Sequence, residues 1–185
     1  MNSSERIKPI RYNDPSTAHY ITFSCNQRRN LFLDDFLFNE FIKSLDASRA
    51  RHRFEIWAYV IMPNHVHLLL WLLESVTISQ VLKGIKQPFS HRALKHMKLH
   101  YSNLYANLEI IRKNKVFYAF WLQGGGYDRN VYSDINIRNA IEYIHNNPVR
   151  KELVKSPEDW KWSSYRFWEY GDIEPIKMDI PVMWK

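Results

Sequence analysis

Residues 60–71, Val-Ile-Met-Pro-Asn-His-Val-His-Leu-Leu-Leu-Trp, decide the fold of this chain. They predict a strand, a tight turn at Met62-Pro63-Asn64, and a second strand that carries His65 and His67. Side chains two apart on a strand point to the same face, so the two imidazoles lie side by side. Two neutral imidazoles can share one divalent ion, which makes the pair a candidate metal site. The alternative is that the histidines end a buried strand and are each satisfied by a neighbour.

Hydrophobic patterns before this hairpin predict a strand and then a helix. The β-branched and aromatic run at 19–25 is typical of a strand. Asp34 or Asp35 can cap a following helix, whose apolar residues recur at i, i+3, i+4 and i+7. The hairpin strands, at 54–60 and 65–73, are apolar at most positions, so we expect them at the centre of a covered sheet.

Beyond the hairpin the pattern is more broken. A second helix is expected from Ser75 or Thr77, and Pro88 should kink or end it. A short helix is expected around 104–111, and a strongly aromatic fourth strand at 115–122.

The last predicted helix brings two polar residues together. It begins at Ser133 or Asp134 and should end near Asn147, because Pro148 disfavours helical geometry in the residue before it. Tyr143 and Asn147 are four residues apart, so they lie on one face of this helix.

The order of elements is therefore strand, helix, two strands, helix, strand, helix. This order predicts an α+β fold, a ferredoxin-like split βαβ arrangement with a largely antiparallel sheet flanked by helices. At 185 residues, the chain 1–185 is expected to form a single domain with a basic, aromatic C-terminal segment at about 150–170. That segment could contact nucleic acid by charge and stacking, or simply pack onto the core.

Composition favours a polyanionic partner. Lys and Arg number 26 against 19 Asp and Glu, a formal charge of +7, and nucleic acid is the simplest such partner. No apolar run reaches the roughly 20 residues of a membrane-spanning helix, so no membrane partner is expected. One cysteine and no signal peptide fit a cytoplasmic, DNA-associated protein.

Four sequence blocks resemble one protein family. Met-Pro-Asn-His-Val-His at 62–67, Tyr-Asp-Arg at 127–129, Tyr-Ile-His-Asn-Asn-Pro-Val at 143–149 and Pro-Glu-Asp-Trp-Lys-Trp-Ser-Ser at 157–164 occur in the order seen in REP-associated tyrosine transposases. These proteins are a branch of the single-tyrosine transposases with an HUH motif (His, hydrophobic residue, His). The blocks are specific in combination, and the resemblance covers about residues 19–168.

The resemblance implies an HUH nuclease domain and assigns a site. His65, His67 and Asn147 would bind the metal, and Tyr143 would be the nucleophile. Two imidazoles plus oxygen ligands suit Mg2+ or Mn2+. Tyr143 would attack a phosphate of single-stranded DNA beside a hairpin and form a 5′-phosphotyrosine, so that the strand can later be rejoined. By the same resemblance a monomer is expected rather than a dimer.

Other assignments stay open at this point. Tyr127, after a flexible glycine run, is the second candidate nucleophile. The chain could instead be a non-catalytic DNA hairpin-binding protein on the same scaffold, or a metal-dependent hydrolase that uses water. The segment from about 94 to 114 is longer than the family pattern leads us to expect. Candidate phosphate contacts, each equally a possible surface charge, are Lys83, Lys86, Arg92, Arg129 and Arg150.

Overall fold

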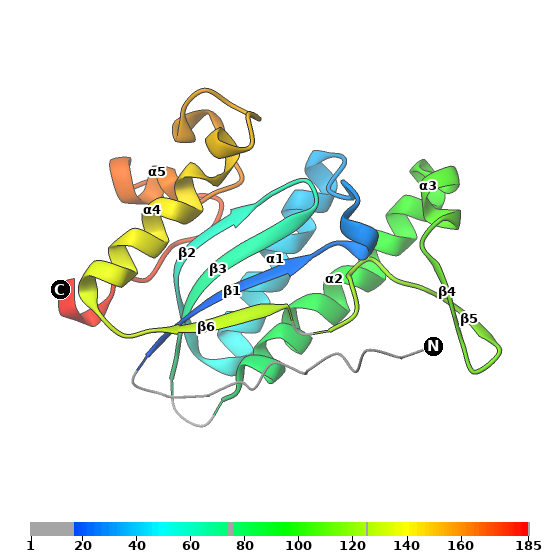
Figure 1. The fold of residues 1–185 in the computed structure, drawn as a ribbon, viewed down its shortest axis with the longest axis horizontal. Helices are drawn as coiled ribbons and strands as arrows, with labels where there is room; N and C mark the ends of the chain where they lie inside the picture. The colour runs from blue at the N-terminus through cyan, green and yellow to red at the C-terminus, as the bar shows by residue number, and fades with distance from the viewer. Residues whose placement is uncertain (1–16, 74–75, 125, 185) are drawn as a thin grey trace, which may run out of the picture.

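The computed structural model describes residues 17–73, 76–124 and 126–184. Its central sheet has the strand order β2-β3-β1-β6, and each neighbouring pair is antiparallel (Figure 1). The strands are β1 (Ala18–Ser24), β2 (Phe54–Ile61), β3 (His65–Leu72) and β6 (Tyr127–Val131). The element order β1-α1-β2-β3-α2-β6 confirms the predicted ferredoxin-like fold class.

Helices cover the two faces of this sheet unequally. The helices α1 (Asp35–His52) and α2 (Ile78–His100) lie together on one face, and α4 (Asp134–Arg150) lies on the other (Figure 1). As predicted, Asp34 caps α1, its Oδ1 accepting a hydrogen bond of 3.0 Å from the Leu37 N–H. The smaller elements are α3 (Ser102–Ala106), β4 (Glu109–Arg112), β5 (Lys115–Tyr118) and α5 (Tyr165–Tyr170).

Strand alternation divides the core into two parts and thereby positions the histidines. On β3, the even-numbered residues Val66, Leu68 and Leu70 pack into the larger core, under α1 and α2. The odd-numbered side chains of β3 face α4, where Leu69 belongs to the second core. Because side chains two apart share a face, His65 and His67 also face α4.

A β-bulge adapts β2 to this arrangement. The register with β3 shifts between Ile56 and Ala58, so Trp57 is the extra residue. Trp57 and Ala58 both pack into the core beside α4, whereas Ile56 and Tyr59 pack into the core under α1 and α2. The bulge thus exchanges which face odd and even positions occupy along the strand.

Two predictions beyond residue 100 were wrong. The sheet's fourth strand is β6, at 127–131, and not the aromatic run 115–122. Residues 115–118 instead form β5, which pairs with β4 in a separate two-stranded sheet. The helix expected around 104–111 ends at Ala106, and Ile111 lies in β4. Strand propensity marks the type of a segment, but it does not identify its pairing partner.

Two prolines, Pro88 and Pro148, lie inside helices without ending them. Pro88 does not end α2, which continues to His100, and α4 continues past Pro148 to Arg150 instead of ending near Asn147. A proline costs its helix one hydrogen bond, and packing of the helix against the sheet offsets that cost. Thr77 caps α2, while Ser75 lies outside the described residues. In the described part of the chain, no helix is both long and apolar enough to cross a membrane.

Candidate active site

One cleft between the sheet and α4 brings together the four residues that the sequence assigned to chemistry. His65 and His67 enter it from β3, and Tyr143 and Asn147 enter it from α4. Other parts of its wall come from the end of β1, the loop after it, the β2–β3 turn and the residues after α4: Thr22, Ser24, Arg28, Asn30, Met62, Pro63, Asn64, Lys151 and Leu153.

The two imidazoles are close and uncharged. The His65 Nε2 and His67 Nε2 atoms lie 3.0 Å apart. Burial, with the nearby Lys151 ammonium, lowers the pKa of His65 to about 4. Burial, with the neighbouring His65, lowers the pKa of His67 to about 3. Both rings are therefore neutral near pH 7, the form in which histidine binds a metal.

Strand β1 holds the His67 ring in place. The register places Thr22 directly opposite His67, and both Thr22 Oγ1 and Tyr20 Oη lie 2.7 Å from His67 Nδ1. These hydroxyl oxygens can accept the Nδ1–H, which leaves the Nε2 lone pair on the side of His65 and Asn147. Such partners of a metal-binding histidine fix its tautomer and its ring orientation.

Asn147 supplies a carbonyl oxygen that has no partner in the described structure. The side chain is 3 % exposed, its Nδ2 lies 3.1 Å from His67 Nε2, and its Oδ1 is buried without a hydrogen bond. The oxygen and nitrogen of an amide are assigned from the surrounding hydrogen bonds, and a half-turn would direct Oδ1 at the histidines. A buried carbonyl without a partner is costly, and after this half-turn a cation beside the histidines would satisfy Oδ1.

The residues present therefore fit a hard divalent ion. Two neutral imidazoles and an amide oxygen form a donor set that Mg2+ or Mn2+ accepts, with the other positions open to water or phosphate. Among residues 17–73, 76–124 and 126–184, no group of three or more His, Cys, Asp or Glu side chains could hold a metal. A site here thus depends on the Asn147 oxygen as its third protein ligand.

Tyr143 stands at the mouth of the cleft. Its side chain is 40 % exposed, so a substrate can reach it. Its ring lies edge-on to His67 and to Tyr20, with centroid distances of 5.9 and 6.2 Å. The Arg150 guanidinium carbon is 4.6 Å from the Tyr143 ring centroid. The helical spacing of four residues therefore places a hydroxyl-bearing ring beside the candidate metal site.

The predicted phosphate contacts fall in different places. Arg129 lines a second cleft, which shares Tyr143 with the first and is also lined by Tyr20, and Arg150 stacks on Tyr143. The Lys86 ammonium lies 5.2 Å from the Phe23 ring centroid.

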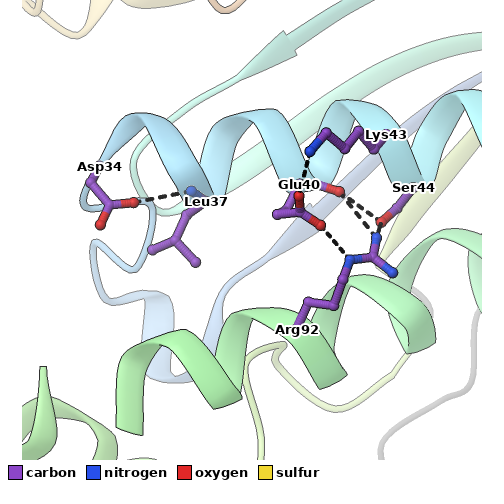
Figure 2. A network of polar contacts seen from close by, with 6 residues as sticks. All are labelled: Asp34, Leu37, Glu40, Lys43, Ser44 and Arg92. Atoms are coloured by element: carbon purple, nitrogen blue, oxygen red, sulfur yellow. Dashed lines mark hydrogen bonds and ion pairs between the residues drawn. The ribbon is translucent and has the colours of Figure 1, made fainter. Parts of the chain in front are cut away.

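Lys83 and Arg92 belong to α2, on the other face of the sheet. Arg92 pairs with the Glu40 carboxylate and donates a 2.6 Å hydrogen bond to Ser44 Oγ (Figure 2). The DNA-binding roles of all five cations stay predictions.

The second candidate nucleophile lies outside this cleft. Tyr127 is 56 % exposed and lines the second cleft with Arg129, whereas the histidines line the first. In the C-terminal segment, the Trp162 ring stacks on Phe38 at 4.5 Å, and Trp160 Nε1 donates to the Ile61 carbonyl. For these two tryptophans the packing interpretation is correct.

Tyr20 and Thr22 are the site residues that sequence reasoning missed. Alternation along β1 puts them on one face of that strand, but only the pairing register shows that this face meets His67.

Comparison with known proteins agrees with the fold and gives the family. The family model described as "Transposase IS200 like" matches residues 16–147. A curated relative from Haemophilus influenzae, described as a REP-associated tyrosine transposase, is 25% identical over 149 residues, which are 80% of this chain and 78% of the relative. A solved structure, a REP-associated tyrosine transposase bound to a REP hairpin, matches with a TM-score of 0.66 and 22% identity over 96% of this chain and 93% of that one. That structural likeness supports the fold.

Proposed function

Because the chain belongs to the family of IS200-like transposases, we propose that it is a metal-dependent enzyme that cuts and rejoins single-stranded DNA beside hairpins. Tyr143 is its nucleophile, and His65, His67 and Asn147 are its metal ligands. The observation that carries the proposal is the single cleft lined by all four residues. Tyr143 is accessible there, and both imidazoles are uncharged near pH 7.

The proposed reaction is a transesterification at phosphorus. The Tyr143 hydroxyl oxygen attacks the scissile phosphate, the bond from phosphorus to the 3′ oxygen breaks, and the phenol proton passes to that leaving oxygen. The products are a 5′-phosphotyrosine and a free 3′-hydroxyl. Since the new ester has the same bond type as the old one, a 3′-hydroxyl can attack it and restore the strand.

The residues around Tyr143 support this chemistry in distinct ways. A divalent ion, when bound, supplies charge neutralisation on the non-bridging phosphate oxygens. Tyr20 and Thr22 orient the His67 ring, and α4 fixes the spacing between Tyr143 and Asn147. The Arg150 guanidinium stacks on the Tyr143 ring, which supports a proposed role for it in contacting the substrate phosphate.

The substrate class follows from charge and from the related structure. The chain carries a formal charge of +7, which suits a nucleic-acid backbone. The related structure matched over nearly the whole chain is bound to a REP hairpin. Hairpin DNA with a single-stranded flank is therefore the substrate we propose, bound by the protein as a monomer.

A comparison of two tyrosine variants tests the proposal. Purified wild type, Tyr143→Phe and Tyr127→Phe are incubated with Mn2+ and end-labelled hairpin DNA that carries a single-stranded flank. We expect a covalent protein–DNA band from wild type and from Tyr127→Phe, and none from Tyr143→Phe. Loss of the band with EDTA supports the metal requirement.

Two results would redirect the assignment. A covalent band from Tyr143→Phe would remove Tyr143 from the nucleophile's role. If the wild type binds the hairpin tightly but never nicks it with Mg2+ or Mn2+, the chain is a hairpin-binding protein on this scaffold.

A further inference from the structure

The hairpin formed by β4 and β5 is a two-stranded ribbon that extends beyond the end of the sheet (Figure 1). Its register pairs Arg112 with Lys115 and Ile111 with Val116. The two residues between the strands, Lys113 and Asn114, have φ values of 47° and 59°. Positive φ at both central positions is the signature of a tight type I′ turn, so the ribbon has a defined shape and tip.

The ribbon exposes apolar side chains that its own fold does not cover. Ile111 is 70 % exposed, Val116 is 55 % exposed and Phe117 is 46 % exposed. Residues directly opposite each other share a face, so Ile111 and Val116 form one exposed apolar pair. An isolated two-stranded hairpin is at best marginally stable in water. Exposed apolar side chains gathered on such an element indicate a surface that is covered in a complex.

The tip of the ribbon is strongly basic. Arg112, Lys113 and Lys115 surround the turn, and the one acidic residue of the ribbon, Glu109, lies at its base. In the part of the chain that the structure describes, these three cations form no ion pair. The tip therefore offers three free positive charges to a partner.

The base of the ribbon is anchored beside the candidate cleft. The Tyr118 ring stacks on Tyr105 with a centroid distance of 4.2 Å. Beyond β5 the chain returns to the end of β1, where the Asn26 N–H donates to the Phe120 carbonyl at 2.7 Å. The adjacent Cys25 N–H donates to the carbonyl of Asn64, a residue of the cleft wall, at 2.8 Å. A partner in the cleft that continues past the end of β1 would thus meet the ribbon.

We propose that the β4–β5 ribbon is an arm that enters the major groove of the hairpin's duplex stem while the single-stranded flank lies in the cleft; this rests on the proposed function. The major groove of B-DNA admits a two-stranded β-ribbon, and apolar side chains there contact thymine methyl groups. Cations at the tip reach the phosphates that border the groove. A second copy of the chain is the less favourable occupant, because two such basic tips would repel each other.

The register allows the arm to be shortened without disturbing its base. Antiparallel pairs alternate between hydrogen-bonded and non-hydrogen-bonded, so a two-residue turn that now follows the Arg112–Lys115 pair can equally follow the pair Ile110–Phe117. Replacing residues 111–116 by Asn-Gly keeps the Tyr105–Tyr118 stack and removes the tip. The point variant Lys115→Gln removes one tip charge. Lys177→Gln is its matched control, an exposed lysine beyond α5.

Binding is measured against salt concentration for hairpin DNA with its flank and for the flank alone. We expect the shortened arm to bind the hairpin at least about tenfold more weakly, and to bind the flank as wild type does. Lys115→Gln should reduce the slope of log K against log salt by about 1, and Lys177→Gln should leave it unchanged. Circular dichroism checks that each variant is folded.

The outcomes separate this proposal from the catalytic one. Hairpin affinity and salt slope unchanged in the shortened arm would overturn the arm's role, even if Tyr143 forms its covalent adduct. Equal weakening on the flank alone would also overturn it. If sedimentation shows that the wild type is a dimer and the shortened variant is a monomer, the ribbon is a self-association surface instead. Stem binding that depends on the arm would support it even if no adduct ever forms.

Discussion

Arg92, one of the predicted DNA contacts, forms an ion pair with Glu40, and we expect this pair to have a structural role. Glu40 on α1 is 7 % exposed, and its carboxylate receives hydrogen bonds from Lys43 and from Arg92 of α2 (Figure 2). Burial raises the pKa of the Glu40 carboxyl, but the hydrogen bonds from Lys43 and Arg92 outweigh it, so the pKa lies below its usual range. The carboxylate is thus charged in the folded state and ties α1 to α2.

The magnitude follows from exposure. A hydrogen bond to a charged group contributes about 1.5–3 kcal/mol when buried. The Arg92 side chain is 39 % exposed and the Lys43 side chain is 69 % exposed. When the Glu40 hydrogen bonds are removed, water therefore replaces part of the hydrogen bonding that Arg92 and Lys43 lose. Glu40→Gln and Arg92→Gln should each lower the free energy of unfolding by about 1–2 kcal/mol at pH 7, with a coupling energy of about 1 kcal/mol between them.

A double-mutant cycle measured by urea denaturation at several pH values is the assay. A carboxyl with a lowered folded-state pKa stabilises fully above its unfolded pKa, and the contribution is lost as pH falls through the folded value. The Glu40–Arg92 coupling should therefore be constant above about pH 4.5 and shrink below it. An Arg92→Gln protein of unchanged stability that binds DNA more weakly would refute the structural role.

Substitutions at three further positions should change stability or Mn2+ affinity in a predictable direction. Gly84→Ala should destabilise the fold by about 1–2 kcal/mol, because the new Cβ would lie 2.7 Å from Ser48 Oγ; thermal denaturation that shows a gain near 1 kcal/mol would mean that helix propensity alone governs the site. Thr22→Val should weaken Mn2+ binding by about tenfold, measured by calorimetry, since it removes a partner of His67 Nδ1; unchanged affinity would count against the site. Asn147→Leu should lose Mn2+ binding while Asn147→Asp retains it, and equal loss in both would show that the side-chain oxygen is not a ligand.

Residues close in sequence carried most of what could be predicted. The β2–β3 turn, the alternation that turns His65 and His67 to one face, and the four-residue spacing of Tyr143 and Asn147 are all local patterns. They placed the four candidate residues on β3 and α4, the two elements whose side chains meet in one cleft.

Features that depend on pairing between distant segments could not be found in this way. The pairing of β6 with β1 is set by a neighbour more than a hundred residues away, so the polar segment Tyr127–Val131 carries little strand signal by itself. The hydrogen bonds between His67 and the hydroxyls of Tyr20 and Thr22 depend on the same kind of long-range register. The β4–β5 ribbon has the composition of a sheet strand, and only the structure shows that it lies outside the main sheet with apolar side chains exposed.

The most direct test of the central claim is to locate the modified residue. Wild-type protein is incubated with Mn2+ and hairpin-flanked single-stranded DNA, digested with protease and nuclease, and the peptides are examined by mass spectrometry. We predict one peptide from α4 that carries a 5′-linked nucleotide on Tyr143. The modification on Tyr127, or nicked DNA with no modified peptide at all, would contradict the claim that the cleft of His65, His67 and Asn147 serves a tyrosine nucleophile on α4.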